Sequence, residues 1–100
     1  MITSNKVFKY VIGSQCTEHM IPKDAIFLTC LLDPATGRVP ALYFLVDEDR
    51  EKESRRFTNY YTGEAVNEKL IAYSHGVSTY LGTAINIHGI VMHVFEDKKI

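Results

Sequence analysis

Short apolar runs separated by turn residues follow one another along the chain, a pattern typical of an antiparallel β protein. β-branched and aromatic residues gather in these runs, and glycine, proline, asparagine or aspartate follows most of them. The predicted strands are Val7–Ile12, Thr17–Ile21, Ala25–Leu32, Val39–Asp47, Phe57–Thr62, Thr79–Ile85 and Ile90–Glu96. Grouped as three hairpin-like units, they predict a mainly β fold, a small antiparallel β-barrel or sandwich of about six strands.

The clearest predicted hairpin joins Ala25–Leu32 to Val39–Asp47 through the turn Asp33–Arg38. Pro34 presets φ for a type I turn, and Gly37 supplies the left-handed residue that closes it. Both arms are apolar at nearly every position, so we expect these strands to be partly covered on both faces.

A second hairpin is predicted at the end of the chain, with Thr79–Ile85 paired to Ile90–Glu96 around a turn at 86–89. In this register His93 faces Ala84 across the ladder. One face of the last strand then holds Val91, His93 and Phe95.

Two segments depart from the strand pattern. Residues 64–74 place Val66, Leu70 and Tyr73 at helical spacing, which predicts one short helix and makes the fold a β-rich α+β type. Glu48–Arg56 is a run of mixed charges, for which we expect a solvated connection between strands.

The composition predicts one domain over residues 1–100 that can form a hydrophobic core without disulfides or a structural metal. The chain is 46% hydrophobic, and 11 basic residues nearly balance 12 acidic ones. A net charge of −1 gives no general attraction to nucleic acid or to acidic membranes. No secretory signal or membrane-length apolar stretch is visible, so we expect an intracellular protein with Cys16 and Cys30 as reduced thiols.

No motif in the sequence predicts catalysis, a metal or a cofactor. His88 and His93 lack further ligands at a diagnostic spacing for zinc, so we interpret His88 as a turn residue and His93 as a hydrogen-bonded, part-buried strand residue. The acidic run Asp47–Asp49 lacks the ligand spacing and glycine of a calcium loop. Neither cysteine has the local signature of thiol catalysis, and we expect a protein that is not an enzyme.

The best candidate for ligand binding is the stretch from 55 to 63. Its candidate residues are Arg55, Arg56, Tyr60, Tyr61 and Thr62. Adjacent guanidiniums suit phosphate, tyrosines can stack on a base, and Thr62 offers a hydroxyl beside an approachable glycine backbone. The alternative is an amphipathic strand whose arginines extend to solvent and whose tyrosines include one in the core.

Several short motifs, in order along the chain, resemble a family of small phage-encoded proteins of unknown function. They are Lys9-Tyr10, Met20–Ala25, Ala41–Asp47, Thr62-Gly63, Tyr80-Leu81-Gly82-Thr83 and Gly89–Glu96. The chain departs from that pattern by extra residues between Gly63 and Tyr80 and by a longer turn at 33–38. The resemblance implies a phage origin and a β-rich fold, and it brings no known functional residues.

These observations lead to two functional hypotheses. The first is a non-catalytic phage accessory protein in the host cytoplasm that binds a host protein, such as a defence factor, and inhibits or redirects it. The contact would be made by a sheet edge or by an exposed aromatic patch such as Tyr43, Tyr60, Tyr61, Tyr73 and Tyr80. The alternative is a homo-oligomer that sequesters a nucleotide-type immune signal. Because the strands carry more apolar surface than one small sheet can hide, we expect a dimer.

Overall fold

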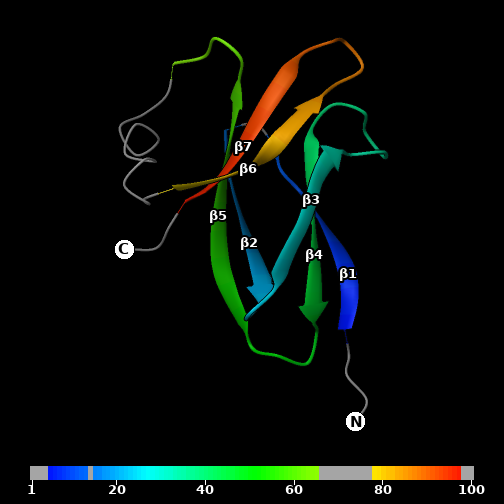
Figure 1. The fold of residues 1–100 in the computed structure, drawn as a ribbon, viewed down its shortest axis with the longest axis vertical. Helices are drawn as coiled ribbons and strands as arrows, with labels where there is room; N and C mark the ends of the chain where they lie inside the picture. The colour runs from blue at the N-terminus through cyan, green and yellow to red at the C-terminus, as the bar shows by residue number, and fades with distance from the viewer. Residues whose placement is uncertain (1–4, 14, 66–77, 98–100) are drawn as a thin grey trace.

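The computed structural model describes residues 5–13, 15–65 and 78–97, and these contain seven β-strands (Figure 1). The strands are β1 Asn5–Val11, β2 Gln15–Pro22, β3 Ile26–Leu32, β4 Pro40–Asp47, β5 Lys52–Tyr61, β6 Ser78–Ile85 and β7 Val91–Asp97. Each of the seven predicted strands therefore overlaps an observed one.

The strands form two antiparallel sheets that face each other as a sandwich (Figure 1). Sheet A has the order β1-β4-β3, and sheet B has the order β2-β5-β7-β6. The expected mainly β fold is confirmed, but the barrel alternative is wrong, because the described strands form two separate ladders and do not close into one. The connections β1–β2, β2–β3 and β4–β5 each cross between the sheets. At these three connections the chain passes from one layer to the other, whereas β5, β6 and β7 follow one another within sheet B. Among the described strands, hairpins are formed by β3–β4 and β6–β7, so two of the three predicted hairpin-like units are observed.

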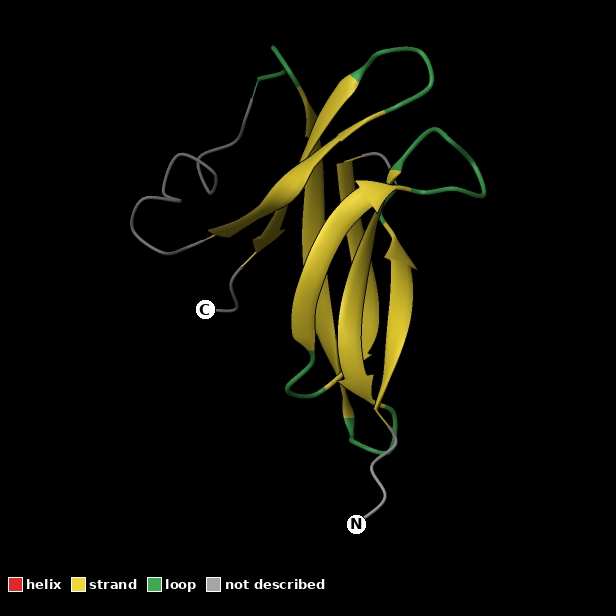
Figure 2. Cartoon of the chain, turned by 45° about the vertical axis from the view of Figure 1, so that its right-hand side comes forward, coloured by secondary structure: helices red, strands yellow, loops and turns green. Residues whose placement is uncertain are grey.

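The predicted helix at 64–74 lies mostly within residues 66–77, which are outside the described part of the chain. Its first two residues, 64 and 65, are not helical. The described residues contain strands, loops and turns but no helix (Figure 2). Accordingly, no helix in them is long and apolar enough to cross a membrane.

The expectation that Glu48–Arg56 forms a solvated connection is wrong for its second half. β5 begins at Lys52 and pairs with β2 along the segment from Lys52 to Asn59. Within this strand Lys52 and Arg56 stay exposed, and two further side chains have partners on neighbouring strands. Ser54 donates to the Glu18 carboxylate over 2.5 Å, and Arg55 pairs with Glu96.

Both predicted hairpins are confirmed, and the second has a shifted register. β6 and β7 are joined by five residues, with Ile85 opposite Val91, because the backbone of Asn86 donates to the Ile90 carbonyl. A register shift between Tyr80 and Gly82 marks a bulge further along β6. Because the five-residue connection places Ile85 opposite Val91, Thr83 and not Ala84 lies opposite His93.

Phe44 of β4 lies at the centre of the core between the sheets. Its ring makes edge or tilted contacts with Tyr10, Phe27 and Phe57, whose centroids lie 5.5–6.2 Å away. The fully buried apolar cluster comprises Ile12, Ile21, Leu42, Phe44, Val46, Phe57 and Val94. It draws on both sheets, so burial of these side chains is what holds the two layers together.

An ion pair lies inside the sandwich beside this cluster. Arg55 on β5 donates from Nε and a terminal nitrogen to the two carboxylate oxygens of Glu96, over 2.6 and 2.7 Å. The guanidinium carbon lies 4.8 Å from the centre of the Phe44 ring. Both charged side chains are only 19% exposed, and the hydrogen bonds to Glu96 raise the pKa of Arg55. The pair links β5 to β7 and covers one side of the aromatic core.

Gly82 allows β6 to pass close to β3 at one edge of the sandwich. A Cβ at position 82 would lie 2.7 Å from the Cβ of Cys30, and the residue has φ +154°. Only glycine fits this approach without displacing β3. The glycine of the Tyr80–Thr83 motif is therefore explained by the close approach of β6 to β3.

We predict that Arg55→Ala lowers the free energy of unfolding by about 2–4 kcal/mol, because it leaves the Glu96 carboxylate largely buried without its partner. Chemical denaturation measures the change. Replacing both partners, as in Arg55→Met/Glu96→Leu, should recover part of the loss, since no buried charge then remains. Arg56→Ala is the matched control on the opposite, exposed face. An Arg55→Ala effect no larger than the Arg56→Ala effect would contradict the prediction.

Candidate functional site

The candidate binding residues lie along β5, where strand alternation separates the two arginines. Arg55 points between the sheets and is bound to Glu96. Arg56 lies on the outer face of sheet B, opposite Asp97 of β7, and is exposed. Two guanidiniums on opposite faces cannot grip one phosphate, so the structure does not bring these arginines together.

The remaining three candidates divide in the same way. Tyr60 is 9% exposed on the outer face of sheet B, where its ring meets the Phe95 ring edge-on at 6.3 Å. Tyr61 points to the other side of the strand and is 43% exposed. Thr62 directly follows the strand and hydrogen-bonds to His93. Of the five residues, Arg56, Tyr60 and Thr62 therefore lie on the outer face of sheet B.

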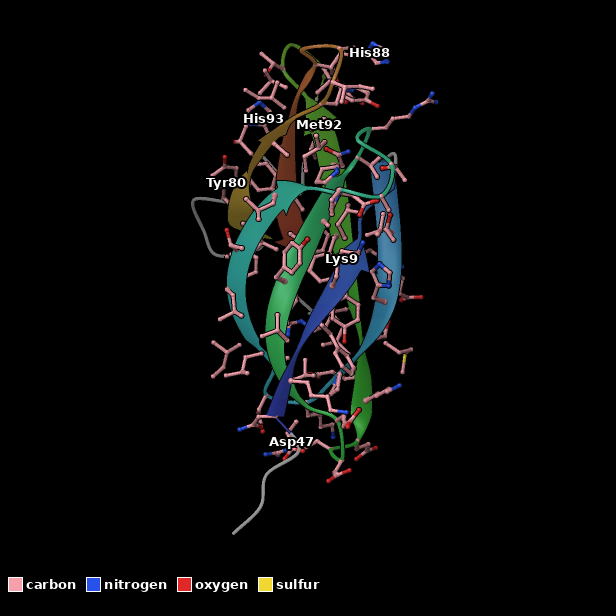
Figure 3. The ribbon with its side chains drawn as sticks, turned by 90° about the vertical axis from the view of Figure 1, so that its right-hand side faces the viewer. Lys9, Asp47, Tyr80, His88, Met92 and His93 are labelled. Atoms are coloured by element: carbon pink, nitrogen blue, oxygen red, sulfur yellow. The ribbon has the colours of Figure 1, made fainter. Side chains whose placement is uncertain are left out.

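A chain of hydrogen-bonded side chains crosses this outer face and runs from Thr62 through His93 and Thr83 to Tyr80. His93 lies at the centre of this chain and is labelled, with Tyr80, in Figure 3. Its Nε2 lies 2.6 Å from the Thr62 hydroxyl, and its Nδ1 lies 3.1 Å from the Thr83 hydroxyl. The Thr83 hydroxyl also contacts the Tyr80 hydroxyl. This chain links the end of β5 to β7 and β6, and the rings of Tyr80 and Phe95 pack beside it at 5.2 Å.

Both ring nitrogens of His93 are occupied by threonine hydroxyls. A neutral imidazole has one donor and one acceptor, and these two contacts use both. A general base would instead need a nitrogen free for substrate and a group such as a carboxylate to orient the ring. The prediction of a hydrogen-bonded, part-buried strand residue is confirmed for His93, and the geometry favours a role in holding the sheet together.

His88 is separate from His93, as its prediction as a turn residue requires. It is exposed in the β6–β7 turn at one end of the molecule, whereas Asp47 lies near the other end (Figure 3). Within residues 5–13, 15–65 and 78–97, no three histidine, cysteine or acidic side chains gather closely enough to hold a metal ion.

The acidic run Asp47–Asp49, at the end of β4 and in the turn after it, makes contacts within the chain. Glu48 pairs with Lys6 over 2.6 Å, and the Asp47 carboxylate accepts the backbone N–H of Asp49 over 3.1 Å. Arg50 pairs with Asp24 over 2.7 Å. These contacts stabilise the turns at the end of the sandwich where β4 finishes.

Large apolar side chains are exposed on the outer surface of sheet A. We call this surface the apolar face, and it is formed by Val7, Ile26, Leu31, Tyr43 and Leu45. Val7 and Ile26 flank Leu45 from either side in the ladder. Val7, Ile26 and Leu31 are 57%, 58% and 53% exposed. The expected cover on both faces therefore does not hold for the outer face of β3, whereas Tyr43 and Leu45 of β4 are half-buried.

A second exposed apolar group lies in the β6–β7 hairpin. We call it the isoleucine tip, and it consists of Ile85, Ile87 and Ile90, which are 58%, 66% and 45% exposed. The strand pattern predicted this turn but not its outward isoleucines, because isoleucine in a short apolar run indicates burial as readily as exposure.

The tyrosines proposed for partner contact do not form one patch. Tyr43 belongs to the apolar face on sheet A, whereas Tyr60, Tyr61 and Tyr80 belong to sheet B. Tyr73 lies outside the described residues. Aromatic composition alone could not reveal this division, because it depends on which sheet each strand joins.

We predict that the two cysteines differ in reactivity. Burial raises the pKa of the Cys30 thiol to about 11, whereas Cys16 is exposed. At pH 8 only about one Cys30 thiol in a thousand is then ionised, so iodoacetamide should modify Cys16 at least roughly tenfold faster. Mass spectrometry of timed samples measures both rates. Cys16→Ser is the control and should leave only the slow phase, while equal rates at pH 8 would contradict the prediction.

Comparisons with known proteins give a family but no activity. No curated protein and no solved structure matches the sequence. The match to a family covers residues 3–100, and therefore includes every strand of both sheets. The chain belongs to DUF7352, a family defined by a domain of unknown function.

Proposed function

We propose that this chain is a non-catalytic, phage-encoded accessory protein of the host cytoplasm that binds a host protein and inhibits or redirects it. The observation that carries the proposal is the exposure of the isoleucine tip. Apolar surface of this kind is typical of protein contact. The resemblance of the C-terminal motif Gly89–Glu96 to phage proteins supports the assigned origin.

The pairing of the polar groups also supports binding over chemistry. Asp33 is 1% exposed and its carboxylate accepts from Lys9 over 2.8 Å, which lowers the pKa of Asp33. His93 uses both ring nitrogens, and Arg55 is held by Glu96. Groups that catalyse a reaction need a free position toward substrate, and these have structural partners instead.

The same ion pair favours protein contact over the alternative of a nucleotide sponge. A site for a nucleotide phosphate would use the fork of Arg55, but that fork donates to both Glu96 oxygens. Breaking the pair to bind a phosphate would leave Glu96 without its partner. Arg56 alone remains exposed from the predicted arginine pair.

We further propose that two copies of the chain pair through the apolar face. Lys9 lies beside Tyr43 on this side of sheet A, and its ammonium is already bound to Asp33. Pairing of two identical faces therefore brings together apolar rows and a neutralised lysine, without repulsion between like charges. Sheets pack face to face at ~10 Å through such rows.

The size of the apolar face indicates a weak dimer. Three strands ~4.8 Å apart and about seven residues long outline an area of roughly 300 Å². A standard interface buries ~800 Å² per partner, so residues at the rim must supply the remainder. We therefore expect dissociation in the micromolar range.

We predict that Leu31→Glu abolishes this dimer, because it places an unpaired carboxylate of each copy in the apolar interface. Sedimentation velocity over a series of concentrations measures the mass. Met20→Glu is the matched control, since Met20 is 56% exposed on a strand of sheet B. The proposal would be contradicted if the wild-type chain stays monomeric over a 100-fold range of protein concentration, or if the Leu31→Glu chain still dimerises.

We predict that a tagged chain expressed in its host retains one host protein in near-stoichiometric amount. The retained proteins and the bound small molecules are both identified by mass spectrometry. Adding the purified host protein should raise the melting temperature of the chain, because a partner that binds only the folded state stabilises it. Enrichment of a nucleotide with no retained protein would overturn the proposed function.

A further inference from the structure

The turn that carries the isoleucine tip is held by hydrogen bonds of one residue, Asn86, through both its side chain and its backbone. The Asn86 side-chain oxygen accepts the backbone N–H groups of His88 and Ile90, over 2.8 and 3.0 Å. The Asn86 backbone also donates to the Ile90 carbonyl over 3.0 Å and accepts from Gly89 over 2.9 Å. Because four hydrogen bonds fix the loop, its apolar side chains are held in their outward positions.

A second loop supports the tip from the side of sheet A. The Ile87 backbone donates to the Gly37 carbonyl in the β3–β4 turn over 3.1 Å. A Cβ on Gly37 would lie 3.1 Å from the Ile87 side chain, so the two loops are in close contact. The β3–β4 turn is itself held by a 2.8 Å hydrogen bond from Gly37 to the Asp33 carbonyl. The two turns lie at the same end of the sandwich (Figure 1).

The tip is therefore an apolar projection that needs little ordering before it binds. Ile87 is 66% exposed despite its contact with the second loop. An anchor that is already fixed in its bound form loses little conformational freedom on association. A projecting apolar group of this kind fits a concave apolar pocket on a partner.

The charges around the tip define the partner further. Arg38 and His88 are exposed in the two loops. In the segment 33–39 the acidic residue is Asp33, whose side chain is buried and bound to Lys9. The segment 85–91 contains no acidic residue. Within these two loops the exposed formal charge is that of Arg38, which complements a carboxylate at the edge of a pocket.

We propose that the isoleucine tip inserts into an apolar pocket, bordered by carboxylates, on the partner protein. The proposal rests on the proposed function and adds the surface and the chemistry of the contact. A protein fits better than an anionic bilayer, because adsorption to such bilayers uses clusters of about four to eight lysines and arginines. The two loops offer only Arg38 beside the tip.

The test places the photo-crosslinker p-benzoylphenylalanine at position 87 of the full chain, and at position 20 as the control with similar exposure. After irradiation in host lysate, position 87 should link one protein that position 20 does not. The linked peptide should line a pocket containing apolar residues and aspartate or glutamate. Ile87→Ser should weaken binding of that purified protein at least tenfold, and Arg38→Glu should slow its association about tenfold.

Ile85→Ser provides a second variant, because the inter-loop contact with Gly37 is made by Ile87. Equal affinity of wild type, Ile87→Ser and Ile85→Ser for the partner would overturn the role of the tip and leave the proposed function standing. Links from position 87 only to a second copy, or flotation of the chain with phosphatidylglycerol vesicles that Ile87→Ser abolishes, would also overturn it. If wild type retains no host protein at all, both proposals fail.

Discussion

The contact between the two sheets around Phe44 is the constraint on which the rest of the structure depends. Phe44 of sheet A meets Phe57 of sheet B, and Arg55 covers the same ring while it binds Glu96. Burying the aromatic cluster requires both layers, and the ion pair is tolerated there because each charge has its full partner. Once these inward positions are filled, strand alternation decides which residues remain for the surface.

The functional surfaces follow from that alternation. On β5 it directs Arg55 inward and Arg56 outward, which removes the predicted pair of adjacent cations. On sheet A it directs Val7, Ile26 and Leu31 to the outside, where each is more than half exposed. The proposed binding of another protein rests on the outward apolar side chains of the isoleucine tip, since apolar surface of this kind is typical of protein contact.

Local sequence signals predicted much of the fold and little of the candidate site. The hairpins were predictable because Gly37 and Asn86 act on their immediate neighbours. Lys52–Arg56 was predicted as part of a solvated connection because it is a run of charges, whereas its pairing with β2 and the contact of Arg55 with Glu96 join segments distant in the chain. The link between Thr62 and His93 spans 31 residues of sequence, and no local pattern indicates it. The isoleucine tip needed the structure because apolar composition does not distinguish a buried turn from an exposed one.

The amino-acid sequence by itself determined the β class, the approximate positions of most strands and the two turn-bounded hairpins. These depend on backbone preferences and on spacing over a few residues. Only the tertiary structure decided that β1 and β2 belong to different sheets, that Arg55 pairs with Glu96, and which apolar residues face solvent. The physical reason is that such contacts join residues distant in the chain, and their partners exist only after the two sheets have packed together.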